Sequence, residues 1–364
     1  MATRPDSADG FANRPVAAPT TATPPAAPIT ARELPLQFTG SAAEYFRIWI
    51  VNVCLTLLTL GIFSAWAKVR KKRYFYSHTV LDGTPFQYLG QPIPILKGRI
   101  IAAVLFGLWY AGTHFFVELL PVVFIVAIVL APWVLIRSAA FNARYSAYRN
   151  MTFRFEGTYW SAVKVLYGWW LITVFTFGIA FSWWQQRIKN YLITRSSYGG
   201  INGEFSATGG KFFVTYLIAG LIFIAAGAAV GVLSGVAAVR GGNKITAIIA
   251  MVILFYALYV AAFAYVQARI ANLVWNHTEL PPVKFRSTLR ARDLLGLYVT
   301  NALAILASAG LLIPWATVRM IKYRLSHFGM SAEGDLRDFR GSSATNVHAA
   351  GAEVGEFFDF DFSI

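Results

Sequence analysis

The stretch Thr59-Leu-Gly-Ile-Phe-Ser-Ala-Trp-Ala-Lys-Val-Arg-Lys-Lys-Arg-Tyr-Phe-Tyr-Ser-His78 leaves an apolar segment, passes a glycine and a tryptophan, and enters a basic helix. Its pattern, [ST]-x-G-x4-W-x3-R-x3-Y-x2-[ST]-[HR], occurs twice more, beginning at Thr176 and at Ser308. Three matches with the same spacing indicate an internal repeat. A repeat determines the architecture of a chain before any single element does.

The composition indicates a helical membrane protein. The chain is 57% hydrophobic and 13% charged, whereas soluble proteins carry about 25% charged residues. Several uncharged runs reach the roughly 18 residues that are typical of a membrane helix. These runs lack the apolar and polar alternation of a membrane β-barrel strand. We therefore expect an all-α, multi-pass protein of the bacterial inner membrane.

The net charge of +15 is explained by the membrane. Lys and Arg gather at the ends of the apolar runs, where the positive-inside rule and anionic lipid head groups place them. The expected partners are the lipid bilayer and its anionic head groups, and we expect no binding to nucleic acid. The single cysteine, Cys54, excludes intrachain disulfides and a cysteine-based metal cluster. Searches for the common hydrolase and phosphate-binding motifs also fail, so we expect no enzyme, no metal and no cofactor.

Seven apolar segments organise the chain, near 46–66, 98–120, 121–136, 163–184, 212–239, 245–267 and 294–318. The predicted domains are a disordered cytoplasmic tail (1–34), two membrane repeats (36–150 and 153–280), a truncated third repeat (283–340) and an acidic-aromatic C-terminal tail (341–364). A short extended piece opens each repeat, and a polar turn such as Asp82-Gly83 follows each signature. The role of the C-terminal tail stays open between disorder and docking as an added strand.

Two topologies remain open. If all seven segments cross the membrane, only about 19 of the 32 Lys and Arg lie on the cytoplasmic side. If the three signature segments re-enter, only Arg240 and Lys244 face outward, as the positive-inside rule expects. Against re-entry, each segment is long enough to cross about 30 Å of hydrocarbon, and a re-entrant loop must be buried in protein. We favour four full spans plus three re-entrant or interfacial segments, with seven spans as the alternative.

The Trp, Arg and Tyr positions of the signature are four residues apart, so they share one face of a helix. The three stripes are Trp66, Arg70 and Tyr74, then Trp183, Arg187 and Tyr191, then Trp315, Arg319 and Tyr323. An Arg between two aromatic rings can stack on both. Each stripe either anchors its helix at the level of the lipid head groups, or the three stripes converge on a small anionic ligand or a head group.

Other positions carry narrower predictions. The Ser or Thr two residues before each signature glycine is expected to bond a carbonyl freed at a helix break, with lining of a polar path as the alternative. Asn52 and Asn301 are expected to make helix–helix hydrogen bonds. His114 and Glu118 are four residues apart, so they would share a helix face and are candidates for a polar path. Finally, 227–235 carries three glycines at four-residue spacing and is expected to pack closely against a helix of the same chain, with dimerisation as the alternative.

The signature resembles that of the YjgN family of bacterial inner-membrane proteins. The resemblance rests on residues 46–61, on Trp66-Ala-Lys-Val-Arg-Lys-Lys-Arg-Tyr74, on Leu81-Asp-Gly-Thr-Pro-Phe86 and on Lys97-Gly-Arg99. The third copy departs most, because Leu336 stands where Phe86 and Phe205 stand. The resemblance implies a polytopic inner-membrane protein without an established activity, so it assigns no functional residues.

Two hypotheses about function follow. In the first, a small solute or ion is transported through a path between the repeats, and the arginine stripes line that path. In the second, the chain is a structural or lipid-interacting membrane protein that transports nothing. They differ in the surroundings of Arg70, Arg187 and Arg319, which share a cavity only in the first.

Overall fold

The computed structural model describes residues 32–115, 117–239 and 244–332. The predicted C-terminal tail and Leu336 lie outside this part of the chain, and so do residues 1–31 of the predicted N-terminal tail. Residues 32–34, which were expected to belong to that disordered tail, instead form a strand, β1 (Arg32–Leu34). Strand β1 pairs with the last described strand, β13 (Phe328–Ala332).

The described chain is mostly helical. The helices are α1 (Ala42–Leu58), α2 (Ser64–Ser77), α3 (Pro92–Phe115), α4 (Leu120–Tyr145), α5 (Tyr159–Val163), α6 (Trp169–Phe175), α7 (Phe181–Thr194), α8 (Gly209–Val239), α9 (Lys244–Trp275), α10 (Ala291–Ala307) and α11 (Ile313–Ser326). A 3-10 turn, η1 (Val117–Leu119), links α3 to α4, and a π-helical segment, η2 (Lys164–Gly168), links α5 to α6. Four helices, α3, α4, α8 and α9, are long and apolar enough to span a membrane.

Short strands accompany the helices, so the expectation of an all-α chain is wrong in this respect. They are β2 (Leu36–Phe38), β3 (Thr79–Leu81), β4 (Thr84–Pro85), β5 (Gln87–Tyr88), β6 (Ser146–Tyr148), β7 (Met151–Phe155), β8 (Ser196–Tyr198), β9 (Ile201–Asn202), β10 (Glu204–Phe205), β11 (Thr278–Leu280) and β12 (Val283–Ser287), besides β1 and β13. They form sheets in the orders β1-β13-β12-β11-β10, β2-β3-β4 and β5-β6-β7-β8-β9. Each strand has two to five residues, too few for an alternating pattern to stand out in the sequence.

One apolar cluster joins the three sheets, which we call together the strand region. Its buried members are Leu34, Leu81, Tyr148, Tyr198, Val283 and Ala332. The Tyr148 hydroxyl donates to the Leu81 carbonyl at 2.9 Å, and the Tyr198 hydroxyl donates to the Tyr148 carbonyl at 2.8 Å. The sheets are thus held together by buried hydrogen bonds as well as by apolar contact.

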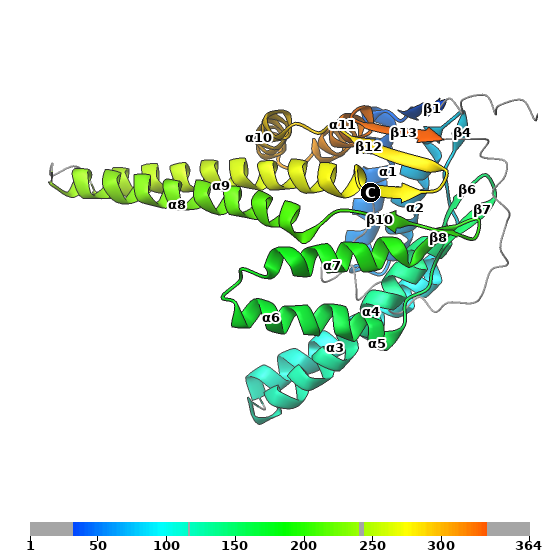
Figure 1. Ribbon diagram of the computed structural model, residues 1–364, viewed down its shortest axis with the longest axis horizontal. Coiled ribbons are helices and arrows are strands. Elements are labelled where there is room, and N and C mark those ends of the chain that lie inside the picture. The colour runs from blue at the N-terminus through cyan, green and yellow to red at the C-terminus, as the bar shows by residue number, and fades with distance from the viewer. Residues whose placement is uncertain (1–31, 116, 240–243, 333–364) are drawn as a thin grey trace, which may run out of the picture. The chain divides into compact units, whose positions relative to one another are not determined.

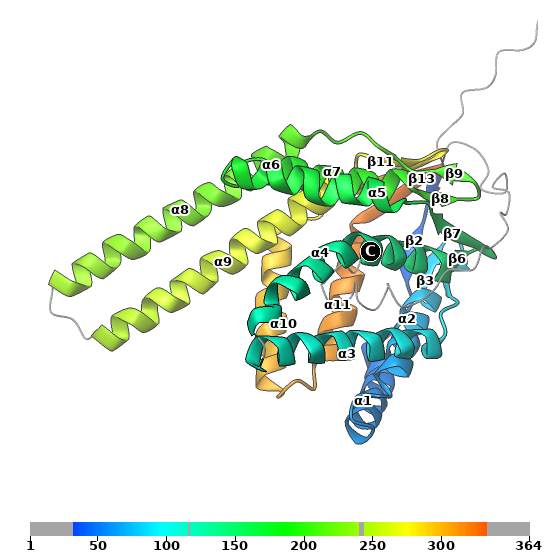
Figure 2. The same ribbon diagram turned by 90° about the horizontal axis from the view of Figure 1, so that it is seen from below.

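Every pair of helices leaves from and returns to paired strands. The flanking pairs are β2 and β3 around α1–α2, β5 and β6 around α3–α4, β7 and β8 around α5–α7, β10 and β11 around α8–α9, and β12 and β13 around α10–α11. The chain is therefore a series of helical hairpins on a strand region. The pair α8 and α9 can be followed side by side in Figures 1 and 2.

Three of these hairpins are short and match in length. The first arms are α1, residues 159–175 and α10, and each of them has 17 residues. The second arms α2, α7 and α11 have 14 residues each. Each signature segment is thus two helices, where the sequence predicted one apolar segment. The break falls at the predicted glycine in all three copies.

The turn of each short hairpin follows the same chemistry. In the first, Leu60 is left-handed with φ 50°, and the Gly61 N–H donates to the Thr56 carbonyl at 2.8 Å. This is the Schellman arrangement that ends many helices. The Thr59 hydroxyl donates to the Leu55 carbonyl at 2.8 Å and accepts from the N–H of residue 63 at 2.9 Å. Thr176 and Ser308 repeat both contacts, with the Ser308 hydroxyl donating to the Ile305 carbonyl. Each hydroxyl thus bonds a carbonyl before the turn, as predicted, but these carbonyls also accept backbone N–H groups, so the helix break has not freed them.

The prediction that the glycine face of α8 packs closely against a helix of the same chain is wrong. A Cβ added to Gly227, Gly231 or Gly235 would meet no described atom within 4 Å outside the helix's own backbone. Ala219 and Ala226, seven residues apart, are instead buried on another face of α8.

Alkaline pH is expected to weaken the strand region. Burial, with the nearby Tyr148, raises the pKa of Tyr198 to about 12, and burial also raises the pKa of Tyr148. An unfolded tyrosine ionises near pH 10. Between about pH 10 and 12 the folded chain therefore binds more protons than the unfolded one, and the free energy of unfolding falls as pH rises.

Thermal unfolding of the full chain in detergent, measured from pH 8 to pH 12, checks this. Tyr198→Phe is expected to be less stable at pH 8, because it loses the bond to Tyr148, but to lose less stability above pH 10. A pH dependence identical to that of the wild type would contradict the assignment to Tyr198.

Candidate functional site

The tyrosine of each signature closes the base of its hairpin. The Tyr74 hydroxyl lies 2.9 Å from both the backbone N and the carbonyl O of Ser41, the N-cap residue of α1. Tyr191 donates to the carbonyl of Thr158, and Tyr323 bonds both backbone groups of Arg290. Burial raises the pKa of Tyr74, which keeps this hydroxyl neutral and able to donate. These tyrosines are structural clamps.

The tryptophans differ between the copies, which corrects the prediction that each Arg stacks within its own stripe. Only Arg319 lies over its own tryptophan, with the guanidinium carbon 5.1 Å from the centre of the Trp315 ring. The Trp66 ring stacks on Phe63, with ring centres 6.1 Å apart. Trp183 packs against Phe213 of α8 at 5.3 Å. Because these two rings are already covered, the first two arginines turn elsewhere.

In the second and third hairpins, the signature arginine instead contacts the residue opposite it on the first arm. Arg187 lies over the Trp169 ring at 5.2 Å. Arg319 donates to the Asn301 side-chain oxygen at 3.0 Å and to the Thr300 hydroxyl at 2.7 Å. Trp169 and Asn301 each precede their turn glycine by nine residues, and the arginines follow it by nine. An antiparallel hairpin brings such equidistant positions together, so the sequence did contain this signal.

In the first hairpin this pairing is not made. Asn52 stands nine residues before Gly61, and its buried side-chain oxygen has no hydrogen-bond partner among the described residues. The expected helix–helix bond is therefore absent for Asn52 and present for Asn301, which also donates to the Ala316 carbonyl at 3.4 Å. Arg70 lies over Phe63, with its guanidinium carbon 5.9 Å from the ring centre.

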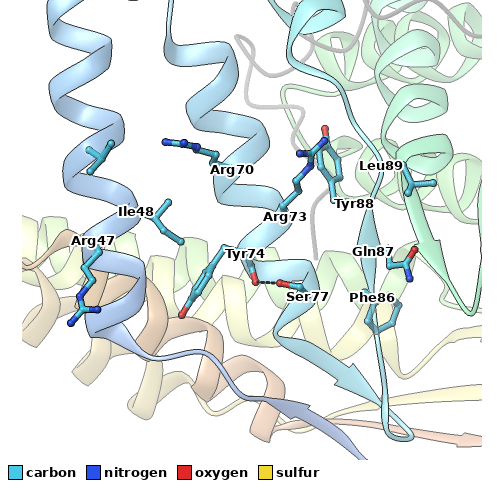
Figure 3. A pocket seen from close by; sticks show the side chains of 11 residues that line it. Arg47, Ile48, Arg70, Arg73, Tyr74, Ser77, Phe86, Gln87, Tyr88 and Leu89 are labelled. Carbon is cyan, nitrogen blue, oxygen red and sulfur yellow. Dashed lines mark hydrogen bonds between the residues drawn. The ribbon is translucent and has the colours of Figure 1, made fainter.

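Arg70 lines an open pocket of about 840 Å³ between α1, α2 and β5 (Figure 3). Arg47 comes from α1, and Arg73 stands three residues after Arg70 on α2. The hydroxyl-bearing Tyr74 and Ser77 lie on the same helix, below both arginines in Figure 3. None of the described lining residues is acidic. Three guanidinium groups therefore give the pocket a positive potential.

The acidic Glu44 lies one turn before Ile48 on α1 and is not among the residues that line the pocket. It accepts a hydrogen bond from Tyr74 at 3.2 Å and lies 3.9 Å from His78. Hydrogen bonds from Ser41 and Tyr74 lower the pKa of Glu44, so it stays ionised. Its contacts are thus with the base of the hairpin, through Tyr74, Ser41 and His78.

The pocket does not gather the three stripes. Its lining includes Arg70 but neither Arg187 nor Arg319, which belong to other hairpins. The interpretation in which three equivalent arginines converge therefore gains no support. Arg47 and Arg73 were not among the residues predicted from the sequence. Arg73 has a signal, since positions three apart on a helix are neighbours, whereas Arg47 has none.

His114 and Glu118 do not share a helix face, which corrects that prediction. Helix α3 ends at Phe115, and Glu118 lies in the 3-10 turn η1. The turn comes just before Pro121, and both side chains are exposed at this end of the α3–α4 hairpin. His114 bonds the Tyr110 carbonyl of its own helix at 3.1 Å. The two residues therefore lie at the end of a hairpin, and their part in a polar path stays a prediction.

Comparison with known proteins gives one broad and several local matches. The family described as "Bacterial protein of unknown function (DUF898)" matches residues 33–357. Inner membrane protein YjgN of Salmonella typhimurium strain LT2 is 47% identical over 53 residues, which are 15% of this chain and 13% of that protein. The protein of the same name from Escherichia coli strain K12 is 37% identical over 73 residues, 20% and 17% of the two chains. The matched stretches thus span less than a fifth of these relatives. No solved structure matches.

Proposed function

The chain belongs to the DUF898 family of bacterial proteins of unknown function, and we propose that it is a lipid-interacting protein whose three short hairpins enter the membrane from the strand region. It is a multi-pass inner-membrane protein, as its four apolar helices and its YjgN relatives show. The proposal adds that the short hairpins are copies of one re-entrant unit.

The tips of the hairpins carry the proposal. Leu60 is 95% exposed and Phe177 is 98% exposed, and both have φ 50°. This left-handed position usually holds Gly or Asn, because a side chain there strains the backbone by about 1–2 kcal/mol. A water-exposed turn gains nothing from a large apolar side chain at such a place. A turn inside the hydrocarbon does, because each tip then buries apolar surface in lipid.

The backbone of the turns supports the same location. A chain inside the hydrocarbon must satisfy its own polar groups. The N–H groups of the turn glycines bond carbonyls at 2.8 Å, and the hydroxyls of Thr59, Thr176 and Ser308 bond both sides of each turn. The N–H groups of the turns are thus satisfied within the chain.

The length and ends of the hairpins favour re-entry over crossing. Arms of 14 and 17 residues measure about 21 and 25 Å at 1.5 Å per residue, less than the roughly 30 Å of a hydrocarbon core. Paired strands hold both ends of each hairpin together. In the first hairpin, residues 68–73 of α2 carry five Lys and Arg on the arm that returns to the strand region. Cytoplasmic placement of the strand region would satisfy the positive-inside rule.

Transport has no comparable observation in its favour. A path lined by the three stripes requires Arg70, Arg187 and Arg319 to share a cavity. The described pocket holds only the first of them, and each of the other two has partners on its own hairpin. The lipid-interacting alternative needs no such cavity.

Cysteine labelling from outside intact cells tests the topology. In a Cys54→Ala background, single cysteines at Ser77, Ser206 and Ser326 follow the three hairpins at exposed positions. We expect all three to be shielded from an impermeant thiol reagent. Glu118→Cys is the positive control, because it lies at the far end of the α3–α4 hairpin and faces outward in either topology. Labelling of Ser206→Cys alone would show seven spans and contradict re-entry.

A further inference from the structure

We propose that the pocket between α1, α2 and β5 binds the phosphate group of an anionic phospholipid. This inference rests on the proposed function, since it needs the first hairpin to lie at the lipid surface. It names the chemistry of the ligand: a phosphate held by arginines, with apolar chains on one side.

The arginines supply the phosphate donors. A guanidinium group carries five N–H donors in a planar fork that matches a phosphate. In the described part of the chain, the Arg70 guanidinium contacts the Phe63 ring and makes no hydrogen bond. Arg73 uses one donor on the Gly90 carbonyl at 3.2 Å, which fixes its side chain beside β5 and leaves its other donors available. The first hairpin therefore presents donors that its own residues do not satisfy.

The equivalent positions explain why the site is confined to one hairpin. Arg319 donates hydrogen bonds to Asn301 and Thr300, and the Arg187 guanidinium lies over the Trp169 ring. Asn52 could accept from Arg70 as Asn301 does from Arg319, yet its oxygen is left without a partner. In the first hairpin Arg70 lines the pocket and does not bond Asn52. In the third hairpin the equivalent Arg319 bonds Asn301, so the two hairpins differ at this position.

The remaining lining favours a lipid over a soluble phosphate. Ile48 and Val51 continue along α1 toward its apolar end, and Leu89 lies beyond β5. Farther along α1, Leu58 is exposed near the hairpin tip. A head-group phosphate on Arg70 and Arg73 would place its acyl chains along this apolar path. Inorganic phosphate would make no use of it.

Titration of the purified full chain in detergent tests the site. The probes are short-chain phosphatidylglycerol, short-chain phosphatidylcholine and inorganic phosphate, and the readout is the Kd from tryptophan fluorescence. We expect phosphatidylglycerol to bind at least about tenfold more tightly than phosphatidylcholine. Arg70→Gln and Arg73→Gln should each weaken that binding by about tenfold or more, since hydrogen bonds to charged groups exceed 1.4 kcal/mol.

Arg187→Gln and Arg319→Gln are the matched controls, because they remove the same charge from the same signature position outside the pocket. Their Kd should stay within about twofold of the wild type, since exposed charges away from a site contribute little. An equal loss in all four variants would overturn the site, as would wild-type affinity in Arg70→Gln. Inorganic phosphate binding as tightly as the lipid would uphold the pocket and overturn the lipid as its source.

The two proposals can fail separately. If cysteine labelling shows re-entrant hairpins while Arg70→Gln binds normally, the pocket is refuted and the lipid-embedded hairpins stand. If Arg70→Gln loses binding but Ser206→Cys is labelled from outside, the pocket stands on a chain with seven spans.

Discussion

Replacing Tyr74 by phenylalanine is expected to destabilise the chain by about 1–3 kcal/mol, the range for leaving a polar partner such as the half-buried Ser41 N–H unsatisfied. The hydroxyl bonds the N–H and the carbonyl of Ser41 and contacts Glu44. These bonds fasten the end of α2 to the beginning of α1. Tyr74→Phe keeps the ring and its packing against Tyr45 at 5.6 Å, so the change isolates the hydroxyl. The measurement is thermal or denaturant unfolding of the full chain in detergent.

The other hairpins provide internal comparisons. Tyr191→Phe should have a similar effect, because that residue is equally buried and bonds Thr158 and Ser161. Tyr323→Phe should have a smaller effect, since its surroundings are more exposed. Tyr256→Phe serves as the control, because Tyr256 is exposed on α9. If Tyr74→Phe unfolds like this control, the clamp does not exist, and an anchoring role for the stripe regains support.

The tyrosine clamp shows how much of the site could be predicted from the sequence. The spacing of the signature correctly located the breaks, and Arg70 lines a pocket, although its role in a ligand site stays a prediction. The signature assigned the tyrosines to a ligand or to the interface, because a pattern of residue types records that a position is constrained without recording the cause. The constraint on Tyr74 is a bond to Ser41, 33 residues earlier, and no local period contains such a contact.

The strand region could not be predicted from the sequence for a related reason. Strand β1 pairs with β13, nearly 300 residues later, and the apolar cluster draws on all three sheets. Strands of two to five residues cannot be identified by alternation, and their pairing depends on where the helices return. The pocket was half predicted. Arg70 belongs to the signature, but Arg47 becomes relevant only when α1 packs beside α2.

Leu60→Asp is expected to destabilise the membrane-embedded chain by up to about 2.5–3.5 kcal/mol, the insertion cost of a charge near the bilayer centre. The backbone predicts the opposite sign in water. Asp tolerates the left-handed conformation of residue 60 better than leucine does, so a tip in water should become slightly more stable. The sign of the change therefore identifies the surroundings of the tip.

The measurement is thermal stability in lipid nanodiscs, with the amount of protein recovered from membranes as a second readout. Phe177→Asp repeats the test at the tip of the second hairpin, where the side chain is 98% exposed and φ is again 50°. Leu60→Met is the control, because it changes the shape of the side chain and adds no charge. Loss of stability in both aspartate variants with little change in the methionine variant would place the tips in hydrocarbon. A stable Leu60→Asp chain would place that tip in water, and its leucine would then be strained and exposed with no lipid to offset either cost.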